Sequence, residues 1–131
     1  MLKDLNGKNV SLSQFKGKTL FIQVWSTWCG VCMAELPSSQ QLWNSLRDHD
    51  EIAFLFVNID DEVNIVNKFM NKRGFDFPAF LRVERSKEFK DDKLPSTFIV
   101  DQKGMILLRH FGSAEWDDPS VREYLFSHSG E

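Results

Sequence analysis

The fold is decided by the stretch LFIQVWSTWCGVC, residues 20–32, in which an apolar run leads directly to the two cysteines of the chain. Residues 20–25 are rich in aromatic and β-branched side chains, a composition that predicts a buried β-strand. A helical pattern begins just after the second cysteine, from Met33 to Leu36. Cys29 and Cys32 are therefore expected where a strand turns into the first turn of a helix.

The start of a helix favours the thiolate form of a cysteine, because unpaired backbone N–H groups and the helix dipole attract an anion. The two-residue spacing also brings the sulfurs of Cys29 and Cys32 close enough for a low-strain disulfide. Both properties are typical of a pair in which one thiolate attacks a disulfide and a second thiol resolves the mixed disulfide. Cys29, nearer to solvent, is the expected nucleophile, and Cys32 is the expected resolving thiol.

Segments around this pair resemble the signatures of thioredoxin-fold proteins. Residues 25–32, WSTWCGVC, match the W-x-x-W-C-x-x-C signature, and Pro37 matches the proline that bends the active-site helix of thioredoxins. The segment LPSTFIVD, residues 94–101, resembles the one that carries the family's cis-proline and leads into the next strand. The resemblance covers nearly the whole chain. It implies an α/β thioredoxin fold, in which helices flank both faces of a central mixed β-sheet.

Further residues resemble one branch of this family, the extracytoplasmic thiol-disulfide oxidoreductases called TlpA-like or ResA-like. Glu35 completes a C-x-x-C-x-x-E-x-P pattern, and residues 5–12 and 15–18 resemble the opening of that branch. Thioredoxins carry a buried acid six residues before the first cysteine, where this chain has Gln23. A neutral amide cannot accept a proton as a carboxylate does. The departure therefore favours the TlpA/ResA-like branch, with Glu35 as the candidate replacement.

The resemblance also implies a surface on which a partner protein binds beside the thiols. Trp28, Gly30 and Val31 would form part of this surface. A cis bond between Leu94 and Pro95 would expose the backbone of Leu94 for pairing with an extended substrate segment. The same bond would shield the thiols from stray metal ions.

The role of Glu35 has two interpretations. Its carboxylate lies three residues after Cys32, within one helical turn, and could tune the redox chemistry by raising the pKa of Cys29. Alternatively, Glu35 is a solvated carboxylate that the helix dipole favours near the helix N-terminus.

Length and composition are those of a single domain, residues 1–131, with one sizeable core. The formal net charge of −3 gives no reason to expect nucleic acid as a partner. No apolar run approaches the roughly 18–20 residues that span a bilayer, and no signal-peptide pattern opens the chain. Because the TlpA/ResA-like branch is extracytoplasmic, we expect the native chain to have a signal, an anchor or further domains beyond this sequence.

The hydrophobic pattern predicts strands at residues 10–12, 20–25, 52–59, 97–101 and 105–111, and helices at 29–47, 62–72 and 118–127. A loop and a short strand are expected at residues 76–81, and no structure is predicted for the charged stretch 82–93. The expected apolar side of the first helix comprises Val31, Leu36, Leu42, Trp43 and Leu46. This order, with a right-handed crossover, predicts a central mixed sheet with helices on both faces.

The predicted function is a thiol-disulfide oxidoreductase that reduces partner proteins through Cys29 and Cys32. It requires no organic cofactor and no metal, because the Cys29–Cys32 disulfide carries the electrons. The resemblance implies client proteins with disulfides or dithiols, a role in cytochrome c maturation, and an upstream membrane thiol transporter of the DsbD or CcdA kind. We expect a monomer that works in the bacterial periplasm or on the outer face of the membrane.

Two other functions stay open from the sequence. The same fold and the same thiols would serve a disulfide-forming oxidase, which differs only in how strongly the thiolate is stabilised. A copper(I)-binding chaperone would use the two sulfurs as soft ligands.

Overall fold

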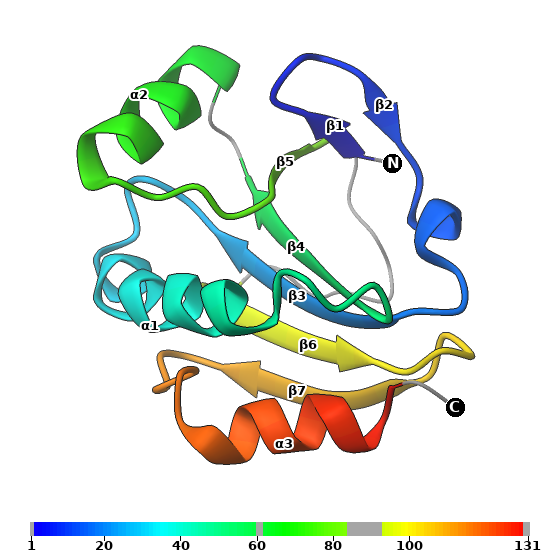
Figure 1. The fold of residues 1–131 in the computed structure, drawn as a ribbon. Coiled ribbons are helices and arrows are strands. Elements are labelled where there is room, and N and C mark those ends of the chain that lie inside the picture. The colour runs from blue at the N-terminus through cyan, green and yellow to red at the C-terminus, as the bar shows by residue number, and fades with distance from the viewer. Residues whose placement is uncertain (1, 60–61, 84–92, 130–131) are drawn as a thin grey trace.

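The computed structural model describes residues 2–59, 62–83 and 93–129 (Figure 1). The charged stretch without a predicted structure lies largely outside these residues. The elements in chain order are β1 (Leu2–Asp4), β2 (Asn9–Val10), the 3-10 helix η1 (Leu12–Phe15), β3 (Thr19–Trp25), α1 (Gly30–Leu46), β4 (Ile52–Asn58), α2 (Val63–Arg73), β5 (Ala79–Arg82), β6 (Ser96–Val100), β7 (Ile106–Phe111) and α3 (Pro119–Ser127).

The strands form one mixed sheet in the order β2-β1-β5-β4-β3-β6-β7. β3 runs parallel to β4 and antiparallel to β6, and β4 runs parallel to β5. All seven residues of β3 are buried, as expected for a central strand covered on both faces. The predicted mixed sheet is therefore confirmed, and β3 lies at its centre.

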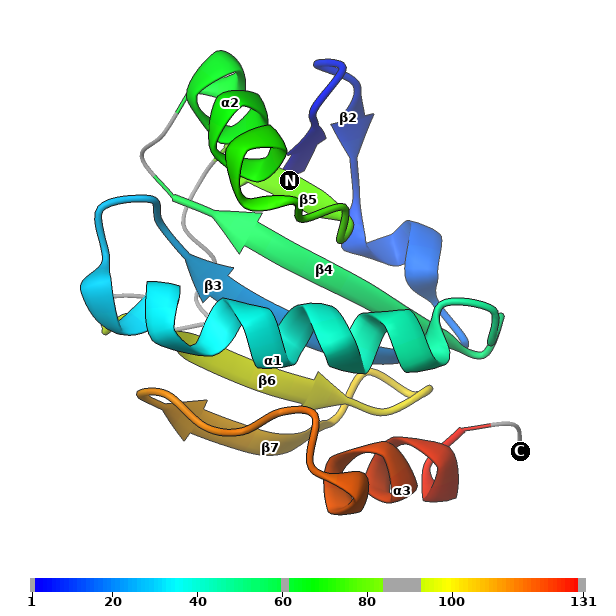
Figure 2. The ribbon, with the colours of Figure 1, turned by 60° about the vertical axis from the view of Figure 1, so that its left-hand side comes forward.

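The three α-helices of the described residues pack against the same face of this sheet (Figure 2). α1 joins β3 to β4 and α2 joins β4 to β5, so both crossovers proceed in the same direction across the sheet. Two right-handed crossovers in one direction place both helices on one face. The opposite face is covered in part by η1, through Leu12 and Phe15. Helices were predicted on both faces of the sheet. Within the described residues, the α-helices cover one face, and the 3-10 helix η1 is the helix that covers the other.

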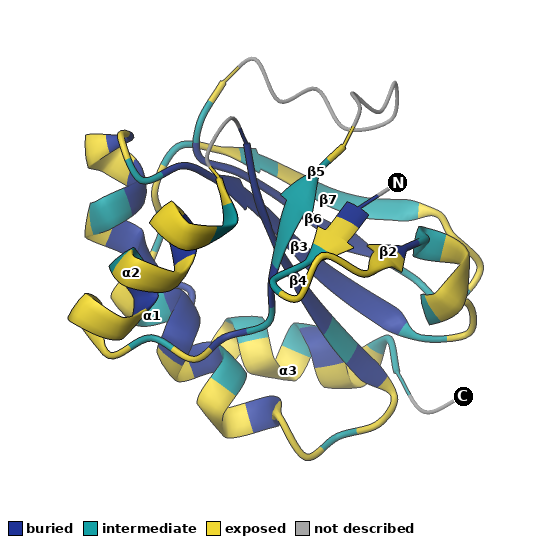
Figure 3. Ribbon diagram, turned by 90° about the horizontal axis from the view of Figure 1, so that it is seen from above, coloured by how far each residue is buried: buried dark blue, intermediate teal, exposed yellow. Residues whose placement is uncertain are grey.

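The core lies on both sides of β3, because alternate side chains of a strand point to opposite faces. Figure 3 shows the buried central strands beside the helices, which carry both buried and exposed residues. On the helical face, the Phe21 ring contacts Phe54 and Trp116, with centroid distances of 5.3 and 5.4 Å. Trp25 packs edge-on against Phe77 at 5.7 Å on the same face. These aromatic rings fix β3 against β4 and against the segments that follow α2 and β7.

Two local predictions differ from the structure. Val31 was expected on the apolar side of α1, but it is 50% exposed, because it lies about 100° around the helix from the buried Cys32. The strand expected at residues 10–12 ends at Val10, and η1 begins at Leu12. The hydroxyl of Ser11 accepts the N–H of Ser13 at 3.3 Å and so caps η1.

No helix in the described part of the chain has the length and apolar character to cross a membrane.

α2 ends where the sequence predicts, at Gly74, whose φ is +71° and whose N–H donates to the Met70 carbonyl. A side chain is strained in this left-handed conformation even though the space around Gly74 is open. Gly74→Ala should therefore lower the free energy of unfolding by about 1 kcal/mol in urea denaturation. Gly30→Ala is the matched control: Gly30 also has open space but no positive φ. Equal losses in the two variants would contradict this account.

Candidate active site

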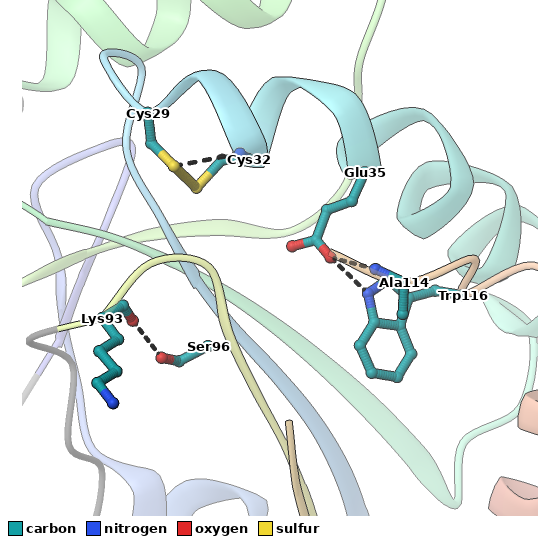
Figure 4. Close-up of a disulfide and its surroundings, with 7 residues drawn as sticks. All are labelled: Cys29, Cys32, Glu35, Lys93, Ser96, Ala114 and Trp116. Carbon is teal, nitrogen blue, oxygen red and sulfur yellow. Dashed lines mark hydrogen bonds between the residues drawn. A yellow bond between two sulfur atoms is a disulfide. The ribbon is translucent and has the colours of Figure 1, made fainter. Parts of the chain in front are cut away.

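The two cysteines form a disulfide at the start of α1 (Figure 4). Cys29 is the N-cap residue of the helix, with extended backbone at φ −90°. Its sulfur accepts the backbone N–H of Cys32 at 3.1 Å. The Cα atoms of the pair are 5.2 Å apart, within the range usual for disulfides. The structure confirms the predicted position of the two cysteines, at the junction between a strand and a helix.

The start of α1 favours a negative charge on the first sulfur. The first turn of the helix contains no acidic side chain, so its N–H groups and dipole act on Cys29 without a nearby carboxylate in that turn. Cys29 is 9% exposed, whereas Cys32 is fully buried one turn inside the helix. An approaching sulfur can therefore reach Cys29 more easily than Cys32.

The residues around the disulfide leave an exposed rim. Trp28 is 63% exposed and Val31 is 50% exposed, and Gly30 between the cysteines is also exposed. These side chains lie outside the core, where a partner protein can contact them. This exposure also explains why Val31 does not belong to the apolar side of α1.

The residues just before β6, Lys93 to Pro95, lie at the same end of the sheet as the start of α1. Because β6 is antiparallel to β3, its first residue, Ser96, pairs with Val24 near the end of β3. The preceding peptide bond, Leu94–Pro95, is cis. The Pro95 carbonyl accepts the N–H of Gly112 at 2.9 Å, which ties this segment to the end of β7. The Ser96 hydroxyl donates to the Lys93 carbonyl (Figure 4).

Glu35 is buried on α1, with 2% of its surface exposed, so it is not a solvated helix carboxylate. Its Oε1 accepts the indole N–H of Trp116 at 2.7 Å and the backbone N–H of Ala114 at 3.3 Å. Burial raises the pKa of Glu35 to about 7, although both hydrogen bonds oppose this rise. Its Oε2 is buried without a hydrogen-bond partner among the described residues.

Gln23 occupies the position at which thioredoxins carry a buried acid, and it is fully buried in β3. Its side-chain amide donates to the Thr97 hydroxyl at 3.1 Å, across the β3–β6 pair. Among the described residues, Glu35 is the one acidic side chain that is buried. Its role as a replacement for the thioredoxin acid stays a prediction.

Trp116 and Ala114 are site residues that the sequence analysis missed. Both lie in the segment between β7 and α3, 81 and 79 residues from Glu35. No local pattern links them to α1, because their contact with Glu35 arises only when β7 pairs with β6. Within the described part of the chain, no group of three His, Cys, Asp or Glu side chains is arranged to hold a metal ion.

The redoxin family profile matches residues 1–125 of the chain. The thiol-disulfide oxidoreductase ResA of Bacillus subtilis is 30% identical over 109 residues, which are 82% of this chain and 60% of that protein. ResA of Bacillus thuringiensis subsp. konkukian is 28% identical over 127 residues, which are 95% of this chain and 72% of that protein. The chain thus spans less than two thirds of the length of the first relative.

Solved structures show the same fold. The crystal structure of StoA from Bacillus subtilis covers 95% of this chain and 93% of StoA, with a TM-score of 0.77 and 23% identity. A thiol:disulfide interchange protein of the thioredoxin family from Chlorobium tepidum TLS covers 94% of this chain and 90% of its own, with a TM-score of 0.73 and 20% identity. The predicted thioredoxin fold and the TlpA/ResA-like resemblance are confirmed, and the chain belongs to the redoxin family.

Proposed function

We propose that this protein is a thiol-disulfide oxidoreductase that reduces disulfides of partner proteins through Cys29 and Cys32. The observation that carries the proposal is the placement of the Cys29 sulfur at the helix N-cap, where it accepts the Cys32 N–H at 3.1 Å. In the reduced protein, the same N–H would stabilise a Cys29 thiolate. The named ResA relatives, which are thiol-disulfide oxidoreductases, support this activity.

The reaction transfers two electrons and two protons. The Cys29 thiolate attacks one sulfur of the partner disulfide, whose S–S bond breaks, and the released partner thiolate takes up a proton. Cys32 then loses its proton and attacks the Cys29 sulfur of the mixed disulfide. The second partner thiolate leaves and is protonated, and the Cys29–Cys32 disulfide remains.

Glu35 is suited to hold the proton that Cys32 must lose. It lies one helical turn after Cys32, and a pKa of about 7 lets it exchange protons at neutral pH. When ionised, its charge opposes a negative charge on the thiols and so raises the pKa of Cys29. A higher pKa of Cys29 means that the reduced form of the protein is stabilised less. The reduced protein then gives up its electrons more readily, as a reductant does and a strong oxidant does not.

The kinds of client and electron donor proposed here rest on the family resemblance. The clients would be extracytoplasmic proteins with disulfides, apocytochrome c among the candidates, and the donor would be a membrane thiol transporter of the DsbD or CcdA kind. The exposed Trp28 and Val31 support a protein client, since large apolar side chains at the surface are typical of contact sites. A reduction potential measured against a glutathione series would distinguish a reductant from a disulfide-forming oxidase.

Replacing each cysteine separately tests the two roles. With dithiothreitol as the electron source, Cys29→Ser should reduce insulin no faster than the uncatalysed background, because it has no attacking thiolate. Cys32→Ser should still attack but should accumulate mixed disulfides, visible by non-reducing electrophoresis and mass spectrometry. If neither variant, or Cys29→Ser alone, traps a partner, the assignment of nucleophile and resolving thiol is wrong.

The buried carboxyl makes stability depend on pH. The pKa of Glu35 is raised in the folded protein from 4.5 to about 7. The free energy of unfolding therefore falls as pH rises through this window, and the loss stays constant at higher pH. In the oxidised protein, Glu35→Gln should remove the penalty and add up to about 3 kcal/mol of unfolding free energy at pH 8 but little at pH 4. Glu115 is an exposed carboxylate next to Trp116 in the chain, so Glu115→Gln is the control. It should leave the free energy of unfolding unchanged at both pH values. A constant difference between Glu35→Gln and wild type across this range would contradict the burial account.

The same substitution tests the effect on the thiol. Above pH 7, where Glu35 is ionised, Glu35→Gln should lower the pKa of Cys29 and speed its alkylation by iodoacetamide severalfold. Below pH 6, where Glu35 is protonated, wild type and variant should react at similar rates. Superimposable rate profiles over the whole range would show that the carboxylate does not act on the thiol.

A further inference from the structure

Trp116 is held in one orientation by its neighbours. It is 4% exposed, and its ring packs edge-on against Phe21 of β3 and His110 of β7, with centroid distances of 5.4 Å each. Rings packed at such angles on two sides have little freedom to rotate. The direction of the indole N–H is therefore fixed by the core and not by Glu35 alone.

The segment that carries Trp116 is also bonded directly to α1. The Ser38 hydroxyl accepts the backbone N–H of Trp116 at 3.1 Å, and it lies 3.3 Å from the Ala114 carbonyl. The backbone N–H of Ala114 donates to Glu35 itself. These contacts attach the segment to one turn of α1, the turn that follows the second cysteine.

The two oxygens of the Glu35 carboxyl have different surroundings. Oε1 accepts both N–H groups, from Trp116 at 2.7 Å and from Ala114 at 3.3 Å, whereas Oε2 has no partner among the described residues. Figure 4 shows Oε1 turned toward Trp116 and the other oxygen on the side of the disulfide. A buried carboxyl oxygen without a partner is costly, and such a group is often retained for chemistry.

We propose that Trp116 is the positioning residue of Glu35: its indole N–H holds one carboxyl oxygen, favours the ionised form, and leaves the second oxygen free on the side of the dithiol. The hydrogen bond itself is independent of any activity. Its consequence for the thiols rests on the proposed function. A tryptophan donor far away in the sequence would thus set how readily the acid beside the thiols exchanges its proton.

Other titratable groups near this pair must be separated from Glu35. His110 of β7 contacts the Trp116 ring, and Tyr124 of α3 lines a cavity together with Trp116. Glu115 and Asp117 flank Trp116 in the chain and are exposed. On α1, the thiols of Cys29 and Cys32 titrate only when the disulfide is reduced. Measurements on the oxidised protein therefore exclude the thiols.

The first test uses the oxidised wild-type protein and requires no core substitution. The indole N–H resonance of Trp116 should shift with pH with a midpoint near 7, because its acceptor gains a charge there. In Glu35→Gln this shift should disappear. A shift that is equally large in Glu35→Gln would not originate from Glu35, and a resonance that does not move in wild type would mean that the bond is absent. Either result would overturn the proposal.

The second test removes the donor and keeps the ring. Trp116→Phe should raise the pKa of Glu35 further, by about one pH unit or tenfold in the protonation equilibrium, as read from the carboxyl carbon resonance of the oxidised protein. Trp43→Phe is the matched control, because Trp43 lies on α1 with its ring against Arg47, at 4.0 Å. Equal effects of the two substitutions on the Glu35 pKa would overturn the proposal.

The consequence for the thiols needs a separate measurement. In reduced Trp116→Phe, the change in Cys29 alkylation that accompanies Glu35 ionisation should move to higher pH by the same amount as the Glu35 pKa. In the Glu35→Gln background, Trp116→Phe should leave the alkylation profile unchanged. If the Glu35 pKa moves while the alkylation profile does not, the positioning by Trp116 stands and the proposed role of Glu35 in thiol chemistry fails. If neither moves, the positioning itself fails.

Discussion

The thiol chemistry of this protein depends on where α1 begins. β3 has a neighbouring strand on each side and all of its residues buried, so packing fixes its end at Trp25. Cys29 follows after a short turn and caps the helix, and its sulfur receives the N–H of Cys32. Because the core holds both the strand end and the helix start, the sulfur stays where the helix dipole favours a thiolate. The rest of the site is arranged around this fixed point.

Glu35 lies on the buried side of the same helix, three residues after Cys32. The helical period brings Cys32, Glu35 and Leu36 to the buried side of α1. Removing a carboxylate from water raises its pKa, and the N–H groups of Trp116 and Ala114 offset only part of that cost. The site therefore combines an anion-stabilising helix start with an acid that changes charge near neutral pH. Under the proposed function, such a balance would give a Cys29 thiol that is reactive without being strongly acidic.

Sheet topology brings distant segments to this point. β6 runs antiparallel to β3, so the start of β6 lies beside the end of β3, and Pro95 comes to the end of the sheet where α1 begins. β7 returns along β6, and Gly112 then bonds to Pro95 at the same end. The segment after β7 lies against α1, where Trp116 donates a hydrogen bond to Glu35. Two successive crossovers in one direction place α1 and α2 on one face of the sheet, and α3 packs on the same face through Leu125.

The sequence by itself determined the elements that depend on local signals. The apolar run of β3, the cysteine spacing at the start of α1, and the Asp118–Pro119 start of α3 each follow from a pattern within a few residues. Tertiary structure decided the exposure of Val31, the burial of Glu35 and the identity of its partner. Glu35 and Trp116 are 81 residues apart, and their hydrogen bond exists only because β3, β6 and β7 lie side by side. The free energy of such a contact depends on burial and direction, which the order of residues along the chain does not specify.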